Sequence, residues 1–261
     1  MQVRRWKVLA AGGLLWAGTA AQAHMPYLLP TMFDVGRGDH VTVTAAFGED
    51  AFVPEIAMRD APFHWIGPDG RRGAIGAPTY LRDLAIFEAD LEAEGTYRLT
   101  TGQRLGRKGK MAEVNGQWVM GGEAVIPAGA RTVDVQSTTL AEAYVTRGKA
   151  SDAALKPLGQ GLEIQLLTHP SSITVGGDAS FRLLFDGKPL PATEITLFRA
   201  AGNHDGRKVA AQTRSHADGG FTLRPEDAGL YLVLVRHRTA APAGADTPYR
   251  SYTYTLAFDA A

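Results

Sequence analysis

Short runs of alternating hydrophobic and polar residues recur along the chain, and turn residues separate them, as in a series of half-buried β-strands. Residues 40–47 alternate and end at Gly48, and residues 180–185 end at the pair Asp186-Gly187. Glycine and proline occur 30 and 14 times, which interrupts the chain too often for long helices. The pattern therefore predicts an all-β protein.

The segment 141–161 is the best candidate for a domain boundary. The strand pattern stops there and gives way to small and polar residues, with glycines at 159 and 161. After it, about seven short strands fit into about 100 residues, a spacing typical of immunoglobulin-like or transthyretin-like sandwiches. We therefore expect two tandem β-sandwich domains, at 24–140 and 162–261, joined by a linker at 141–161.

Residues 1–23 have the layout of a secretory signal peptide. Basic residues precede an apolar stretch at 8–17 that is too short to span a bilayer, and Ala21-Gln22-Ala23 forms a small-x-small cleavage site. No other stretch is apolar for long enough to be a transmembrane helix. We expect cleavage before His24 and a periplasmic mature protein without a membrane span.

Composition removes several classes of function. The chain has no cysteine, which excludes disulfides, thiolate metal sites and cysteine nucleophiles. It balances 27 basic against 27 acidic residues, so its net charge gives no indication of nucleic-acid binding. Motifs such as G-x-S-x-G and S-x-x-K, which mark common hydrolases, are absent as well. We do not expect an enzyme.

His24 is the most informative residue, because cleavage at Ala23 would make it the first residue of the mature chain. An N-terminal histidine offers a metal two nitrogen ligands, the α-amine and the imidazole. A cut after Ala21 would instead place His24 third, where amine, backbone amides and imidazole form square-planar Cu(II) or Ni(II) sites. With either cleavage position, we expect a metal site beside the terminal amine.

The rest of such a site has to come from distant segments, because no H-x-H or H-E-x-x-H spacing occurs among the seven histidines. We expect His24 to be completed by Glu49, Asp50, His64 or His169. Nitrogen with carboxylate ligands suits nickel, cobalt or copper better than calcium.

Two resemblances to known families accompany these observations. The turn at 186–190, the turn at 217–221 and the segment 228–231 make the C-terminal half similar to prealbumin-like sandwiches of the carboxypeptidase-regulatory type. The mature chain as a whole resembles a bacterial periplasmic domain-of-unknown-function family often described as nickel-uptake components. The matching segments are 23–30, 67–70, 161–164, 168–170, 186–189 and 252–258.

This second resemblance implies the handling of nickel, cobalt or a similar metal outside the inner membrane. Some members of that family carry a second histidine in the loop after the first core strand. Here the loop at 47–52 contains Glu49 and Asp50 instead. A site built from histidines alone is therefore not expected in this chain.

We thus expect a metal-binding accessory protein that delivers its metal to a transporter or another envelope protein. One alternative is a non-enzymatic envelope adaptor, or a module that binds carbohydrate or protein. Another is a copper monooxygenase that uses His24, although such enzymes commonly carry disulfides. Metal retention by the processed protein separates the first two, and oxidant-dependent turnover would identify the third.

Overall fold

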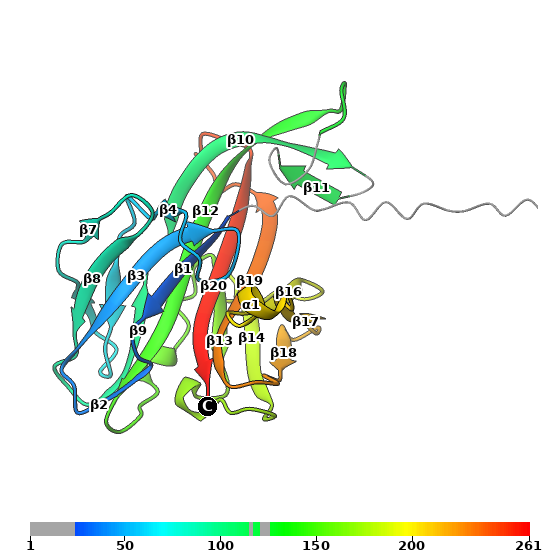
Figure 1. The fold of residues 1–261 in the computed structure, drawn as a ribbon. Coiled ribbons are helices and arrows are strands. Elements are labelled where there is room, and N and C mark those ends of the chain that lie inside the picture. Colours follow the sequence, from blue (N-terminus) through cyan, green and yellow to red (C-terminus); the bar gives the residue numbers. More distant parts are fainter. Residues whose placement is uncertain (1–23, 115–116, 121–125) are drawn as a thin grey trace, which may run out of the picture.

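A computed structural model describes residues 24–114, 117–120 and 126–261, and strands dominate this part of the chain (Figure 1). The all-β class predicted from the sequence is confirmed. The expected signal peptide at 1–23 lies outside the described residues. Among the described residues, no helix has the length and apolar character needed to cross a membrane.

The first sheet is formed entirely by the N-terminal half of the chain. Its five strands follow the order β1-β3-β8-β7, with β4 paired to β3. They are β1 (Met25–Pro30), β3 (His40–Gly48), β4 (Ile56–Ala57), β7 (Thr79–Tyr80) and β8 (Ala85–Asp90). Strand β3 is the alternating run of the sequence, and its valines at 41 and 43 are buried.

The second sheet takes strands from both halves of the chain. Its main path runs β17-β16-β19-β20-β12-β9-β5-β6, with β10, β11 and β2 attached to it. Its N-terminal members are β2 (Asp34–Gly36), β5 (His64–Ile66), β6 (Arg72–Ala74), β9 (Gly95–Thr100), β10 (Arg104–Val114), β11 (Gln117–Met120) and β12 (Thr132–Arg147). Its C-terminal members are β16 (Glu194–Arg199), β17 (Val209–Arg214), β19 (Gly229–Ala240) and β20 (Tyr249–Ala260).

The third sheet belongs to the C-terminal half. It consists of β13 (Leu162–Leu166), β14 (Ala179–Phe185), β15 (Lys188–Pro189) and β18 (Gly220–Leu223). Helical structure in the described residues is limited to single turns. These are the 3-10 turns η1 (Ala153–Leu155) and η2 (Pro170–Ser172) and the helix α1 (Gly202–Asp205).

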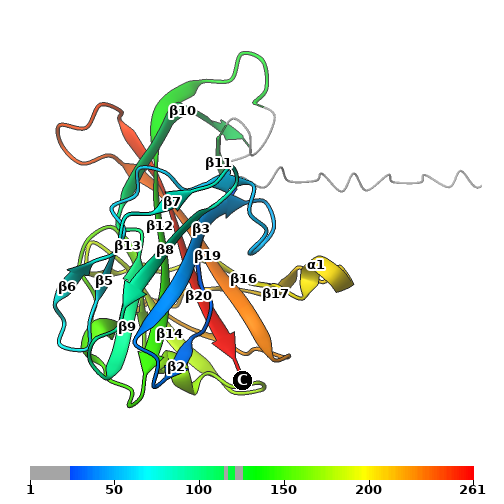
Figure 2. The same ribbon diagram turned by 60° about the vertical axis from the view of Figure 1, so that its left-hand side comes forward.

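The second sheet is the middle layer of the molecule and buries a hydrophobic core on each face. Alternate residues of β19 show this: Tyr231 and Val233 belong to the core under the third sheet, whereas Leu232 and Leu234 belong to the core under the first sheet. Side chains alternate between the two faces of a strand, so one strand serves both cores. Figure 2 shows the first sheet in front of this middle layer.

Strand β12 is longer than the sequence indicates. Residues 141–147, expected to begin a linker, form its second half, and nine residues from Val135 to Ala143 pair in parallel with Tyr249 to Ala257 of β20. Both faces of β12 are buried in this part, as in a strand of a sheet that is covered on both sides. The two halves thus share a sheet, and their division into tandem domains stays a prediction.

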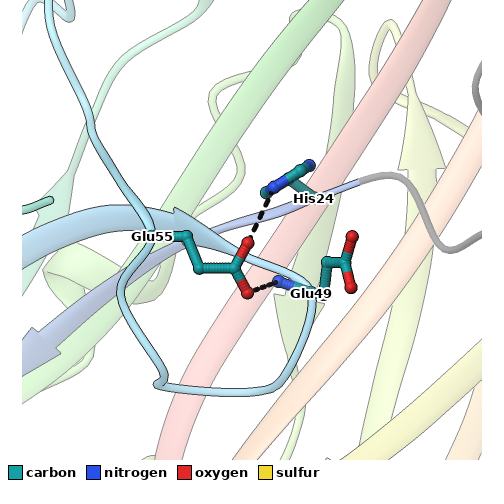
Figure 3. Close-up of side chains that lie close together, drawn as sticks. All are labelled: His24, Glu49 and Glu55. Carbon is teal, nitrogen blue, oxygen red and sulfur yellow. Dashed lines mark hydrogen bonds and ion pairs between the residues drawn. The ribbon is translucent and has the colours of Figure 1, made fainter.

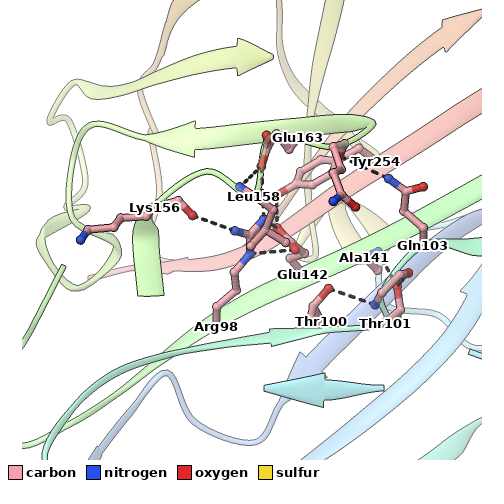
Figure 4. A network of polar contacts seen from close by, with 12 residues as sticks. Arg98, Thr100, Thr101, Gln103, Ala141, Glu142, Lys156, Leu158, Glu163 and Tyr254 are labelled. Atoms are coloured by element: carbon pink, nitrogen blue, oxygen red, sulfur yellow. Dashed lines mark hydrogen bonds and ion pairs between the residues drawn. The ribbon is translucent and has the colours of Figure 1, made fainter. Parts of the chain in front are cut away.

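Buried polar side chains join the two halves through this middle layer (Figure 4). Arg98 of β9 donates hydrogen bonds of 2.8 and 2.7 Å to the two carboxylate oxygens of Glu142 on β12. The hydroxyl of Tyr254 on β20 donates to Glu142 at 2.6 Å. Glu163 of β13 accepts backbone N–H groups at 2.8 Å and lies 4.0 Å from Arg98. The partners meet the requirement that buried charges be paired.

Candidate metal site

The pairing of β1 with β3 brings His24 and Glu49 to the same end of the first sheet. The two strands are antiparallel, and Met25 lies opposite Gly48. His24 directly precedes β1 and Glu49 directly follows β3. In an antiparallel pair, the residue before one strand and the residue after its partner are neighbours. The register therefore places two of the predicted ligands side by side.

Glu55 joins them because the chain turns back after Glu49. Its backbone N–H donates to the carbonyl of Phe47 at 3.0 Å, and the next residue, Ile56, begins β4 opposite Phe47. The segment 49–55 is therefore a loop that leaves β3 and returns to it. Glu55 was not among the ligands expected from the sequence.

The three side chains form a compact cluster (Figure 3). Nε2 of His24 lies 2.8 Å from a carboxylate oxygen of Glu55, and the backbone N–H of Glu49 donates to the other oxygen at 3.1 Å. One ligand atom from each of His24, Glu49 and Glu55 lies within 4.8 Å of the others. The side chains of His24 and Glu55 are each 37% exposed, so the cluster is open to solvent.

The donor set defines what this cluster can do chemically. One imidazole nitrogen and two carboxylates are suited to a borderline divalent ion, and a free α-amine at His24 would add a second nitrogen. Ligand atoms this close together need only small rotations of exposed side chains to converge on one ion. An open face also permits exchange of the ion with a partner.

The loop that presents the two glutamates is packed against β1. The Phe52 ring meets the Tyr27 ring edge-on, with centroids 5.6 Å apart. Phe52 has a φ of 63°, a left-handed conformation that costs a bulky residue energy. Burial raises the pKa of the Tyr27 hydroxyl, which keeps this side chain neutral. The backbone strain at Phe52 is of a kind that persists only where the surrounding structure holds the backbone in place.

The other predicted ligands lie elsewhere or have other partners. Both carboxylate oxygens of Asp50 accept hydrogen bonds from Lys208, at 2.6 and 2.8 Å. His64 is only 8% exposed on β5, and its Nδ1 is 2.8 Å from the carbonyl oxygen of Pro62. Burial lowers the pKa of its imidazole. Neither residue belongs to the cluster around His24.

His169 has a structural position at the start of η2. Its Nδ1 accepts from the backbone N–H of Ser171 and lies 2.7 Å from the hydroxyl of the same residue. Its Nε2 lies 3.0 Å from the hydroxyl of Thr96 on β9. Both ring nitrogens therefore have partners, so His169 caps a turn and ties it to the middle sheet.

Several solved bacterial structures are similar to this chain at low identity. The Yersinia pseudotuberculosis adhesin InvE is 13% identical with a TM-score of 0.23, over 88% of this chain and 58% of its own. The D0–D1 domain of intimin is 12% identical with a TM-score of 0.23, over 90% and 99% of the two chains. A Legionella pneumophila protein of the DUF4785 family is 12% identical with a TM-score of 0.25, over 80% and 50%.

The chain thus spans little more than half of the InvE chain and half of the Legionella chain. Likenesses at these TM-scores support no conclusion about function. Comparison with curated proteins gives no match. The sequence model of one family, described as Domain of unknown function (DUF4198), matches residues 21–239. That match covers most of the sequence, and the chain therefore belongs to the DUF4198 family.

Proposed function

We propose that this protein is a periplasmic metal-binding accessory protein that handles nickel, cobalt or copper for uptake or homeostasis. The observation that carries the proposal is the convergence of His24, Glu49 and Glu55, whose ligand atoms lie within 4.8 Å of one another. Two of these three residues are ligands expected from the sequence. The resemblance to nickel-uptake components supports the same function.

Export completes the site in this proposal. Cleavage after Ala23 makes the nitrogen of His24 a free amine, and amine and imidazole then chelate the ion from one residue. Glu49 and Glu55 supply the oxygen ligands. A metal that binds here displaces the contact between His24 and Glu55, and any proton on the imidazole, so its affinity should fall in acid.

The exposure of the cluster fits a carrier better than a permanent cofactor site. His24 and Glu55 are each 37% exposed, so a receiving protein can approach the ion directly. We propose that this receiver is a metal transporter or another envelope protein. A structural metal, in contrast, is commonly enclosed by four protein ligands.

Titration of the processed protein tests the proposal. The protein is expressed with its own leader, its first residue is identified by mass spectrometry, and Ni(II), Co(II) and Cu(II) are titrated by calorimetry. We expect a mature chain that starts at His24 and binds one ion. His24→Ala should abolish binding, and Glu55→Gln should weaken it. Glu88→Gln, which changes an exposed glutamate of β8, is the matched control.

A variant with a lengthened N-terminus isolates the terminal amine. One extra residue before His24 retains every side chain and moves only the amine, so it should weaken binding strongly. Equal affinity of the extended and processed proteins would show that the amine is not a ligand. A processed protein that binds none of the three ions would overturn the proposal and favour the envelope adaptor.

A further inference from the structure

We infer that Lys208 and Asn203, in the C-terminal half, are positioning residues for the metal site in the N-terminal half. They hold the loop 49–55 in the conformation that brings Glu49 and Glu55 to His24. The inference rests on the proposed function, because it concerns the affinity of that same site. It makes metal affinity a property of the contact between the two halves.

The first contact is an ion pair next to a ligand. Nζ of Lys208 lies 2.6 and 2.8 Å from the two carboxylate oxygens of Asp50, and Asp50 follows Glu49 directly. The side chains of Lys208 and Asp50 are 51% and 34% exposed. Lys208 thereby fixes the carboxylate of Asp50 and, through the backbone, the start of the loop.

The second contact fixes the backbone of the loop itself. The side-chain amide of Asn203 in α1 donates a 2.9 Å hydrogen bond to the carbonyl of Ala51. Ala51 is 3% exposed, so this carbonyl would lose its partner where water has little access. The two contacts therefore hold consecutive residues of the loop, Asp50 and Ala51.

The segment that makes both contacts is a compact turn. Asn203 and Lys208 lie on either side of a tight turn that closes α1, where Gly206 has a φ of 81°. A Cβ at Gly202 would lie 2.5 Å from the Cα of Lys208, so the two ends of the turn are in close contact. Asp205 accepts the backbone N–H of Arg207 within it. Figure 2 shows α1 at the outer end of β16 and β17.

The loop needs such external support because it carries strain of its own. Phe52 adopts a positive φ, and the two glutamate ligands are exposed. Removal of a residue that orients a metal ligand commonly lowers the affinity of the site for its metal about 10- to 100-fold. A loop held in advance in the binding conformation avoids an entropic cost when the ion arrives.

The sign of the effect separates positioning from simple electrostatics. Lys208 is a cation close to a proposed cation site, and its removal also frees the carboxylate of Asp50. Coulomb interaction alone therefore predicts that Lys208→Ala strengthens metal binding. Positioning predicts that it weakens binding. Asn203→Ala changes no charge, so electrostatics predicts no effect for it, whereas positioning predicts a loss.

The test is a titration of the processed full-length variants with Ni(II) and Cu(II). We expect about threefold weaker binding for Lys208→Ala and for Asn203→Ala, and about tenfold for the double variant, at the lower end of the range for residues that orient metal ligands. Lys208→Arg should restore most of the affinity. Lys110→Ala, which removes an exposed 2.8 Å ion pair with Asp134, is the matched control and should bind as wild type.

A spectroscopic measurement adds a readout that stability alone does not change. The electron paramagnetic resonance spectrum of bound Cu(II) reports its ligands, so the double variant should show the loss or displacement of a carboxylate ligand, a change that a lower Tm alone does not produce. Unchanged or tighter binding by Lys208→Ala together with unchanged binding by Asn203→Ala would overturn the inference. Absence of binding by the wild type would instead overturn the proposed function, and the inference with it.

Discussion

Arg98 and Glu142 form a bidentate ion pair in which the side chains are 1% and 0% exposed. The guanidinium donates to both carboxylate oxygens, a geometry that gives strong, directional hydrogen bonds. Burial disfavours the charge of Arg98, but the carboxylate of Glu142 outweighs it and the pKa of the guanidinium lies well above its ordinary value. Arg98 therefore stays charged within the middle layer.

Breaking this pair should destabilise the protein strongly. Arg98→Met leaves the carboxylate of Glu142 buried without its countercharge, and we expect a loss of about 3–5 kcal/mol in the free energy of unfolding. Urea denaturation followed by circular dichroism measures it. The exposed pair between Lys110 and Asp134 is the control, and Lys110→Ala should cost less than about 1 kcal/mol. Equal losses for the two variants would contradict the role of burial.

The stability of the protein should fall in mild acid because of two histidines, the buried His64 and the partly buried His237. Burial lowers the pKa of His64 and of His237 below the ordinary value of 6.5. At a pH between the lowered value and 6.5, the unfolded chain binds protons at these sites and the folded protein does not. The contribution of these two histidines to stability is therefore fully present above a pH of about 6.5. It is lost as the pH falls from there towards the lowered pKa values.

Variants of each histidine identify this contribution. The loss of unfolding free energy between pH values of about 7.5 and 5.5 should be smaller in His64→Gln and in His237→Gln than in the wild type. His40 is the control, because a hydrogen bond with Asp39 raises the pKa of its imidazole. Its removal should not reduce the acid-induced loss. If neither His64→Gln nor His237→Gln changes the loss of unfolding free energy between the two pH values, this explanation is excluded.

The turn between β14 and β15 should be important for stability alone. Asp186 and Gly187 have φ values of 49° and 72°, as in the two-residue hairpin turns that favour Asp-Gly. Gly187→Val forces a branched residue into this conformation, and we expect a cost of about 1–2 kcal/mol or more. Thermal unfolding should show a lower Tm, and metal titration an unchanged affinity. Weaker metal binding without a lower Tm would contradict this interpretation.

Local patterns predict the strands and turns that have one buried face. Residues 40–47, chosen for their alternation, lie in β3, and the Asp186-Gly187 turn joins β14 to β15. Residues 141–147 belong to β12, although they fall in the segment 141–161, where small and polar residues with Gly159 and Gly161 predict a linker. Their partner β20 lies more than 100 residues away in the sequence, and no local pattern indicates a parallel pairing at that distance.

The candidate site was predictable only in part, for a similar reason. His24 is marked by the cleavage pattern, and Glu49 by the family resemblance, because some related chains carry a histidine in the same loop. Glu55 has no local mark, because it reaches the site through the return of the chain to β4. In the sequence, His64 and His169 are possible metal ligands like any other histidine. In the structure, the ring of His64 contacts the carbonyl of Pro62, and the ring of His169 contacts the hydroxyls of Thr96 and Ser171. Those contacts depend on the tertiary structure.

Gly48 should be required for the shape of the loop between β3 and β4. A Cβ at Gly48 would lie 2.0 Å from the carbonyl oxygen of Val53, and this neighbour is backbone that cannot rotate away. Gly48→Ala therefore has to displace the segment that presents Glu49 and Glu55. We expect weaker Ni(II) and Cu(II) binding, measured by calorimetry, and a loss of stability of about 1–3 kcal/mol from overpacking.

Gly76→Ala is the matched control, because a Cβ at Gly76 meets nothing within 4 Å. The same methyl group is added there without a clash, so affinity and stability should stay at wild-type values. A second arm separates a displaced loop from general destabilisation: Gly187→Val lowers the Tm at a turn away from the cluster and should leave the affinity unchanged. If Gly48→Ala binds metal as tightly as Gly76→Ala, the loop 49–55 does not supply the ligands, and a site at His24 would have to be completed by other residues.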